Sequence, residues 1–157
     1  MTAAAKPTGI PWPPLIYIVA IAGAVALGLL LPLPWIAGPL NDILFAIGWL
    51  VILAVIALWV TAVRAMSRAK TTLNPTGEPS HLVTSGPFAV TRNPLYLANT
   101  LLMIGVGLVS AIPWFILLGF VAAFATQKMA IEFEERTLST KFGKKYKDYA
   151  KRVRRWI

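Results

Sequence analysis

The sequence predicts an all-α membrane protein with four transmembrane helices, of which the last two form a helical hairpin. The composition is 57% hydrophobic with a mean hydropathy of +0.69, which is too apolar for a soluble domain. Long uncharged segments recur along the chain, and lysines and arginines gather between them in separate clusters. We expect the whole chain, residues 1–157, to form a single integral membrane domain.

The first two spans are expected at about residues 15–31 and 43–63. The first segment is uncharged, is bracketed by prolines and is just long enough to cross a hydrocarbon core of about 30 Å. The second segment is equally uncharged and is longer. Asn41 and Asp42 precede the second segment and are favourable N-cap residues for it.

The third uncharged segment, residues 95–126, is too long to cross the membrane once. As one straight helix it would measure about 48 Å, well beyond the thickness of the hydrocarbon core. Pro113 marks the expected break, because proline lacks a backbone donor and disfavours helix in the residue before it. Two short spans, 94–110 and 113–129, then form the hairpin.

The distribution of positive charge supports this topology independently. Basic residues crowd the connection 64–92, which contains Arg64, Arg68, Lys70 and Arg92, and they return in the tail 130–157. The connections 32–42 and 110–113 contain no lysine or arginine. By the positive-inside rule, four spans then place both termini, the loop 64–92 and the tail in the cytoplasm.

The C-terminal tail is strongly basic, with ten Lys/Arg against four Asp/Glu from Lys128 onward. We expect it to lie against anionic lipid headgroups, where each cation contributes about 1 kcal/mol, and not to bind nucleic acid. The helix after the fourth span is expected to stop at Gly143, a favourable C-cap residue. A basic amphipathic helix follows at the membrane surface, with apolar positions at Tyr146, Tyr149, Val153 and Trp156.

Composition and patterning limit the possible functions. The chain contains no cysteine, and His81 is its single histidine, so no metal site is expected. No acidic or basic residue lies in the interior of the expected spans, which argues against ion-coupled transport. A membrane scaffold without enzymatic activity stays open as the alternative, and it would tolerate the loss of Glu134.

The start of the third span, Arg92 to Tyr96, has two interpretations. In the structural one, Asn93 is an N-cap, Pro94 suits the first turn, and Arg92 and Tyr96 are a cytoplasmic cation and an interfacial aromatic. In the functional one, the free amides and the positive end of this helix face a small polar ligand.

The acidic cluster at the end of the fourth span also has two interpretations. Glu132 is placed to pair with Lys128 on an exposed helix face, as an i,i+4 ion pair. Glu134 lies on the same stripe as apolar neighbours, so its carboxylate is expected to point inward. A carboxylate that points inward at a membrane boundary is costly unless it binds something.

Taken in order, the polar motifs of the second half resemble one enzyme family. They are Leu-Val-Thr-Ser-Gly-Pro-Phe from Leu82, Arg-Asn-Pro-Leu-Tyr from Arg92, Glu134-Glu135-x-x-Leu138, and Phe142-Gly143-x-x-Tyr146-x-x-Tyr149-x-x-x-Val153-x-Arg155. This set, between residues 82 and 156, resembles the isoprenylcysteine carboxyl methyltransferase family and its phospholipid methyltransferase relatives. Sterol reductases share similar terminal motifs but need many more spans.

The resemblance implies an integral membrane methyltransferase that uses S-adenosyl-L-methionine in a cytoplasmic pocket. The cofactor-binding residues that it implies are Ser80, His81, Leu82, Val83, Phe88, Asn93, Pro94, Leu95, Tyr96 and Glu134. Methyl transfer from a sulfonium is an in-line displacement that needs alignment more than acid–base chemistry. The candidate catalytic residues at the same boundary are Arg92, Tyr96 and Glu135.

Several positions depart from the family pattern. The family often has tyrosine at the position of Phe88 and histidine at that of Asn93, and its loop histidine lies one place before His81. The prenylcysteine enzymes carry a substrate-binding arginine at the position of Ala130, and the sequence leaves open whether Lys128 replaces it.

The resemblance implies a lipidic or small apolar methyl acceptor at the membrane–cytosol boundary. The leading acceptor is a carboxylate such as that of a prenylated cysteine, which is already ionised. A phospholipid amine or a small thiol stays open, and an amine would first have to lose a proton.

Overall fold

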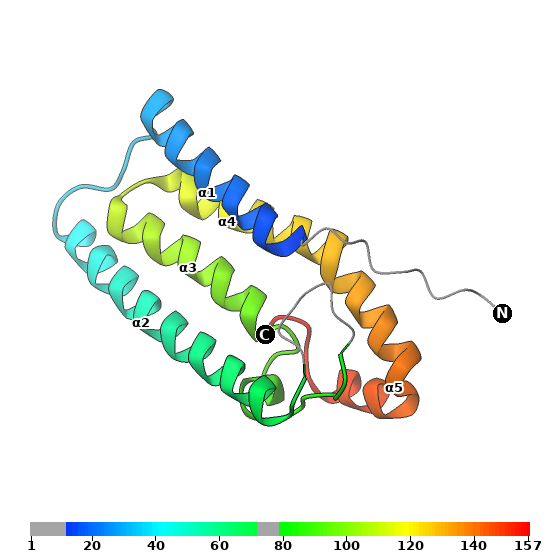
Figure 1. Ribbon diagram of the computed structural model, residues 1–157. Helices are drawn as coiled ribbons and strands as arrows, with labels where there is room; N and C mark the ends of the chain where they lie inside the picture. Colours follow the sequence, from blue (N-terminus) through cyan, green and yellow to red (C-terminus); the bar gives the residue numbers. More distant parts are fainter. Residues whose placement is uncertain (1–11, 72–78) are drawn as a thin grey trace.

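The computed structural model describes residues 12–71 and 79–157, which fold into a bundle of helices (Figure 1). The long elements are α1 (Trp12–Leu30), α2 (Pro39–Arg68), α3 (Pro94–Ser110), α4 (Pro113–Thr126) and α5 (Glu132–Arg152). A 3-10 helix, η1 (Gly86–Ala89), precedes α3, and a π-helical turn, η2 (Gln127–Ile131), joins α4 to α5. The predicted all-α fold is confirmed.

Three helices are long and apolar enough to cross a membrane. They are α1, α2 and the helical rod Pro113–Arg152, which comprises α4, η2 and α5 and is kinked at Gly143. The fourth apolar helix, α3, is shorter, at 17 residues. The chain is therefore a multi-pass membrane protein.

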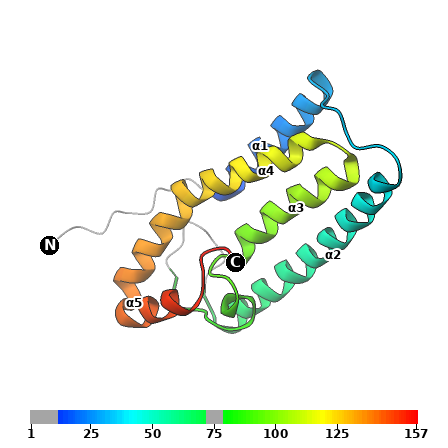
Figure 2. The same ribbon diagram turned by 180° about the vertical axis from the view of Figure 1, so that it is seen from behind.

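The helices pack in pairs along the bundle, with α2 against α3, α3 against α4, and α4 against α1. After α3 ends, Ala111 adopts the left-handed conformation, and α4 begins at Pro113, where the sequence predicts the break. The α1–α2 connection and the α3–α4 turn lie at one end of the bundle (Figure 1). The start of α3, the end of α2 and α5 lie at the opposite end, which is the basic one (Figures 1 and 2).

The α2–α3 pair depends on two glycines that let the backbones approach closely. A Cβ atom built on Gly48 would lie 2.9 Å from the Leu108 Cβ and 3.0 Å from the Gly105 carbonyl oxygen. A Cβ atom built on Gly105 would lie 3.2 Å from the Gly48 carbonyl oxygen. Small residues are the usual means of close helix packing where lipid surrounds both helices.

A buried group of hydroxyls fixes α1 on the bundle. The Tyr17 hydroxyl lies 2.7 Å from Thr100 Oγ1, which in turn donates to the Tyr96 carbonyl at 3.0 Å. Thr126 Oγ1 is also buried and has no hydrogen-bond partner among the described residues. Because the surroundings are apolar, these hydroxyls favour one register of α1 against α3.

Replacing Tyr17 tests this arrangement. Tyr17→Phe removes the hydrogen bond to Thr100, so we expect the free energy of unfolding to fall by about 1 kcal/mol. Thermal melting in detergent measures the change. Thr61→Val is the matched control, because the Thr61 hydroxyl bonds only to carbonyls of its own helix. Equal melting of the two variants would contradict the proposed role of Tyr17.

Two irregularities shape the end of the chain. The π turn η2 adds an extra residue to one turn of the helix, and Gly143 (φ 52°, ψ −125°) breaks α5 into two arms. The second arm turns back toward the start of α3 (Figure 2). Tyr146 and Tyr149 of this arm are each only 4% exposed. The predicted stop at Gly143 is thus a kink after which the helix resumes.

The predicted amphipathic helix ends earlier than expected. It stops at Arg152, so Val153 and Trp156 are not helical. Residues 153–157, which we name the C-terminal strap, run beside the start of α3, where Arg154 forms a parallel bridge with Thr91. The Arg92 amide donates to the Arg154 carbonyl at 3.0 Å. This backbone pairing replaces the helical hydrogen bonds that the sequence pattern predicts.

The predicted cap of α2 is also wrong. The helix begins at Pro39 with Gly38 at the N-cap position, so Asn41 and Asp42 lie in its first turn. Proline favours the first position of a helix because its fixed φ is already helical. The Asn41 side chain instead accepts a hydrogen bond from Trp35 Nε1 at 2.7 Å.

Candidate functional site

The start of α3 and the first arm of α5 meet at the basic end of the bundle. Tyr96 on α3 donates a hydrogen bond of 2.5 Å to Glu134 on α5. Burial raises the pKa of the Glu134 carboxyl to about 7, and the charge of Glu135 adds to the rise, although the Tyr96 hydrogen bond acts in the opposite direction. Glu134 therefore changes its protonation state near neutral pH.

A second contact between the same elements joins Arg92 to Glu135. Arg92 Nη2 lies 3.2 Å from Glu135 Oε1, and Arg92 Nη1 lies 3.4 Å from the Tyr146 hydroxyl. Arg155 holds the same carboxylate at both oxygens, with distances of 3.0 Å from Nε and 2.7 Å from Nη2. Arg92 Nε is buried without a partner among the described residues. Two guanidinium groups thus share one carboxylate.

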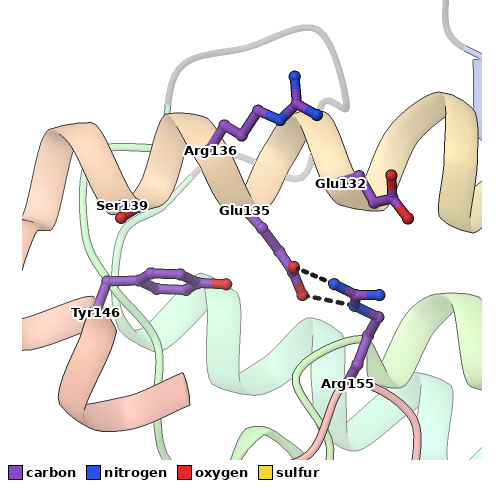
Figure 3. A pocket seen from close by; sticks show the side chains of 6 residues that line it. All are labelled: Glu132, Glu135, Arg136, Ser139, Tyr146 and Arg155. Atoms are coloured by element: carbon purple, nitrogen blue, oxygen red, sulfur yellow. Dashed lines mark hydrogen bonds and ion pairs between the residues drawn. The ribbon is translucent and has the colours of Figure 1, made fainter. Parts of the chain in front are cut away.

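An open hollow of about 400 Å³, which we name the α5 hollow, lies beside this cluster. In Figure 3, Glu135 points from the first arm toward Arg155 of the strap, and the Tyr146 ring projects toward them from the second arm. The lining combines carboxylates, guanidinium groups and hydroxyls, from Glu132, Glu135, Arg136, Ser139, Tyr146 and Arg155. Such a lining suits a polar ligand.

The predicted loop residues lie apart from this hollow. Ser80 and His81 are exposed; the Ser80 hydroxyl donates to the Lys70 carbonyl, and His81 lies next to Ser80. Leu82 is partly exposed and Val83 is buried, at 9%. The Phe88 carbonyl accepts a hydrogen bond of 2.6 Å from Tyr149. Residues 80–83 and Phe88 therefore do not line the α5 hollow.

The first residues of α3 have structural contacts as well. Asn93 stands at the N-cap position but does not cap the helix with its side chain; its Nδ2 donates to the Arg155 carbonyl at 2.9 Å. Pro94 is buried in the first turn, and Leu95 is partly exposed. Among the residues that the resemblance assigns to the cofactor, Tyr96 and Glu134 come from different helices and lie in direct contact.

The expected Lys128–Glu132 pair is present, at 2.8 Å. Lys128 is thus engaged on the exposed face of the rod, while Ala130 is buried, at 6%. Lys128 and Ala130 therefore face different sides, so the Lys128 ammonium does not lie where a side chain at position 130 would lie.

Sequence reasoning missed the strap residue Arg155 and the hollow-lining residues Arg136 and Ser139. Tyr146 was predicted as an apolar position of an amphipathic helix; it is buried, and its hydroxyl also contacts Arg92. The motif that contains Val153 and Arg155 was the available signal. The helical spacing of its apolar positions favoured a surface helix instead.

Comparison with known protein families shows which family the chain belongs to. Residues 43–145 match the phospholipid methyltransferase family. The chain belongs to this family. Comparison with curated proteins gives no match.

The phospholipid methyltransferase match runs from α2 into the second arm of α5. It includes the Tyr96–Glu134 and Arg92–Glu135 contacts but not α1 or the strap. Membership confirms the predicted kinship with integral membrane methyltransferases and places the chain in a methyltransferase family. Within residues 12–71 and 79–157, no three His, Asp or Glu side chains are grouped so that they could hold a metal ion.

Proposed function

We propose that the chain transfers a methyl group from S-adenosyl-L-methionine to a lipophilic acceptor that carries an acid group. The observation that carries this proposal is the convergence of α3 and α5, where Tyr96 meets Glu134 and Arg92 meets Glu135 within one family-matched region. The convergence creates a charged site next to apolar helices, where a cytosolic cofactor and a membrane-bound acceptor can meet.

The chemistry of the site fits this cofactor. The cofactor has an ammonium, a carboxylate, ribose hydroxyls and an aromatic base, and the α5 hollow offers carboxylate, guanidinium, hydroxyl and ring groups. Glu134, which precedes the lining residue Glu135 but does not itself line the hollow, is the residue that would hold the ammonium, and the lining residues Ser139 and Tyr146 are placed for the nucleoside. When bound, the cofactor supplies an activated methyl group on a sulfonium.

Arg92 is the residue that would orient the acceptor. Its contact with Glu135, at 3.2 Å, is longer than those of Arg155, at 3.0 and 2.7 Å, so Arg92 is the less tightly held of the two guanidinium groups and is the one proposed to meet an acid group. A prenylated cysteine offers a carboxylate, and a phospholipid offers a phosphate next to its amine. A small neutral thiol has no such group and is disfavoured.

The two acceptors differ in what they require of the protein. A carboxylate reacts in its ionised form, whereas an amine must first lose a proton. Glu134 is assigned to the cofactor ammonium, and two arginines hold the Glu135 carboxylate, so an amine acceptor would have to reach the site already deprotonated. The phospholipid methyltransferase match favours the amine.

For the membrane topology we propose four crossings, with α3 as the third and α4 as the fourth. The α3–α4 turn and the α1–α2 connection share one end of the bundle, and the basic segments share the other. The positive-inside rule then places both termini and the site in the cytoplasm.

Calorimetric titration with S-adenosylmethionine and its demethylated product tests the proposal. We expect both ligands to bind the purified wild-type protein, and labelled methyl groups to appear on an acceptor from a panel. The panel contains phosphatidylethanolamine, a farnesylated cysteine and an alkyl thiol. The absence of binding to either ligand would reject the enzyme and favour the membrane scaffold.

A further inference from the structure

The C-terminal strap lies outside the family-matched residues 43–145 and yet contacts both halves of the site. Through its backbone it binds the start of α3, because the Arg155 carbonyl accepts hydrogen bonds from Thr91 Oγ1 at 3.1 Å and Asn93 Nδ2 at 2.9 Å. Thr91 is 1% exposed and Asn93 is 9% exposed. The strap is therefore anchored on buried groups, which fixes the position of Arg155.

Through its side chains the strap binds the other half of the site, which is formed by η2 and α5. Trp156 Nε1 donates to Gln127 Oε1 in η2 at 2.8 Å, and Arg155 forms its two hydrogen bonds with Glu135 in α5. A bidentate guanidinium–carboxylate pair is both stronger and more directional than a single contact. Arg155 thus determines where the Glu135 carboxylate lies.

Arg92 shares this carboxylate less closely. Its nearest contact with Glu135 is 3.2 Å, against 2.7 Å for Arg155, and its contact with the Tyr146 hydroxyl is 3.4 Å. Without Arg155, Glu135 would keep Arg92 as its one ion-pair partner among the described residues and would turn to pair with it fully. Arg92 would then lose the donors that the proposed function assigns to the acceptor.

We propose that Arg155 is a positioning residue that keeps Glu135 away from full pairing with Arg92, so that Arg92 stays available for an acid group of the ligand. This inference rests on the proposed function for the identity of the ligand. Its geometric part, the competition of two arginines for one carboxylate, does not depend on which ligand binds.

The test measures the accessibility of Arg92 with phenylglyoxal, which modifies free guanidinium groups, and reads the modification by mass spectrometry. In Arg155→Ala, we expect Arg92 to react about fivefold more slowly than in the wild type. Arg154→Ala is the matched control, because Arg154 is exposed and contacts α3 through its backbone.

A second measurement uses dodecyl phosphate as a lipophilic acid probe. We expect it to protect Arg92 from phenylglyoxal in the wild type and to bind Arg155→Ala about tenfold more weakly. Arg155→Lys retains the charge but not the bidentate contact, so it should show an intermediate effect. It also provides the test if Arg155→Ala does not fold.

Equal or faster reaction of Arg92 in a folded Arg155→Ala protein would overturn the inference. So would equal changes in Arg155→Ala and Arg154→Ala, which would indicate a general loosening of the strap. A wild-type protein that binds no S-adenosylmethionine would contradict the proposed function alone, since the phenylglyoxal rates need neither the cofactor nor the acceptor.

Discussion

The Glu134→Gln variant is expected to bind S-adenosylmethionine about 30-fold more weakly than the wild type. Glutamine keeps the shape of the side chain and can still accept the hydrogen bond from Tyr96, but it removes the negative charge that is proposed to hold the cofactor ammonium. A charge-assisted hydrogen bond contributes about 2 kcal/mol, which corresponds to this factor. Isothermal titration calorimetry in detergent measures the dissociation constant.

Asp148→Asn is the control for this experiment. Asp148 is an exposed carboxylate on the second arm of α5, whereas Glu134 contacts Tyr96 between α3 and the first arm, so the loss of Asp148 should leave cofactor affinity unchanged. An unchanged affinity in Glu134→Gln, or an equal loss in both variants, would contradict the role of Glu134.

The same residue predicts how affinity depends on pH. The pKa of Glu134 is about 7, so its carboxyl is neutral below that pH and charged above it. We expect affinity to rise as pH increases through 7 and to fall again once the cofactor's own ammonium, with an ordinary pKa of about 8, loses its proton. In Glu134→Gln, titration from pH 5.5 to 7.5 should show no rise.

The second large effect is expected for Glu135→Ala, which should lower the free energy of unfolding by about 2 kcal/mol. This change leaves Arg92 and Arg155 near each other without the carboxylate that neutralises them, and uncompensated charges away from bulk water are costly. Arg92 and Glu135 side chains are only 15% and 17% exposed. Hydrogen exchange should also show faster exchange of the strap amides.

Thermal melting with Glu132→Ala as the comparison tests this expectation. Glu132 pairs with Lys128, whose side chain is 52% exposed, so that pair is screened by solvent and contributes little. Glu135→Ala should melt several degrees lower than Glu132→Ala. Similar melting temperatures of the two variants, with unchanged hydrogen exchange of the strap amides, would show that Glu135 is not needed to stabilise Arg92 and Arg155.

The helices were predictable because each is marked by strong local features. Long uncharged segments mark α1 and α2. Pro113 marks the break between α3 and α4, and α4 begins at that residue. The start of α2 was misplaced because Pro39 and the Asn41–Asp42 pair are both valid start signals. The sequence alone does not show at which of these two signals the helix begins.

The candidate site was predictable in part. The stripe shared by Glu134 and apolar neighbours correctly predicted an inward direction, and the Tyr96 contact is consistent with it. The Arg92–Glu135–Arg155 cluster was not predictable, because Arg155 reaches it only when Gly143 reverses the chain direction. A break of one residue in a helix changes contacts tens of residues apart without changing the periodic pattern around it.

The π turn η2 determines which side chains of α5 face α3. An α-helix advances by about 100° per residue, so deletion of one residue from Gln127–Ile131 would rotate everything after it by about that angle. Glu134 would then swing away from Tyr96, and a neighbouring side chain would take its place. In this protein, the one additional residue in a helical turn sets the rotation of α5 about its axis. That rotation determines which acidic side chain of α5 faces α3.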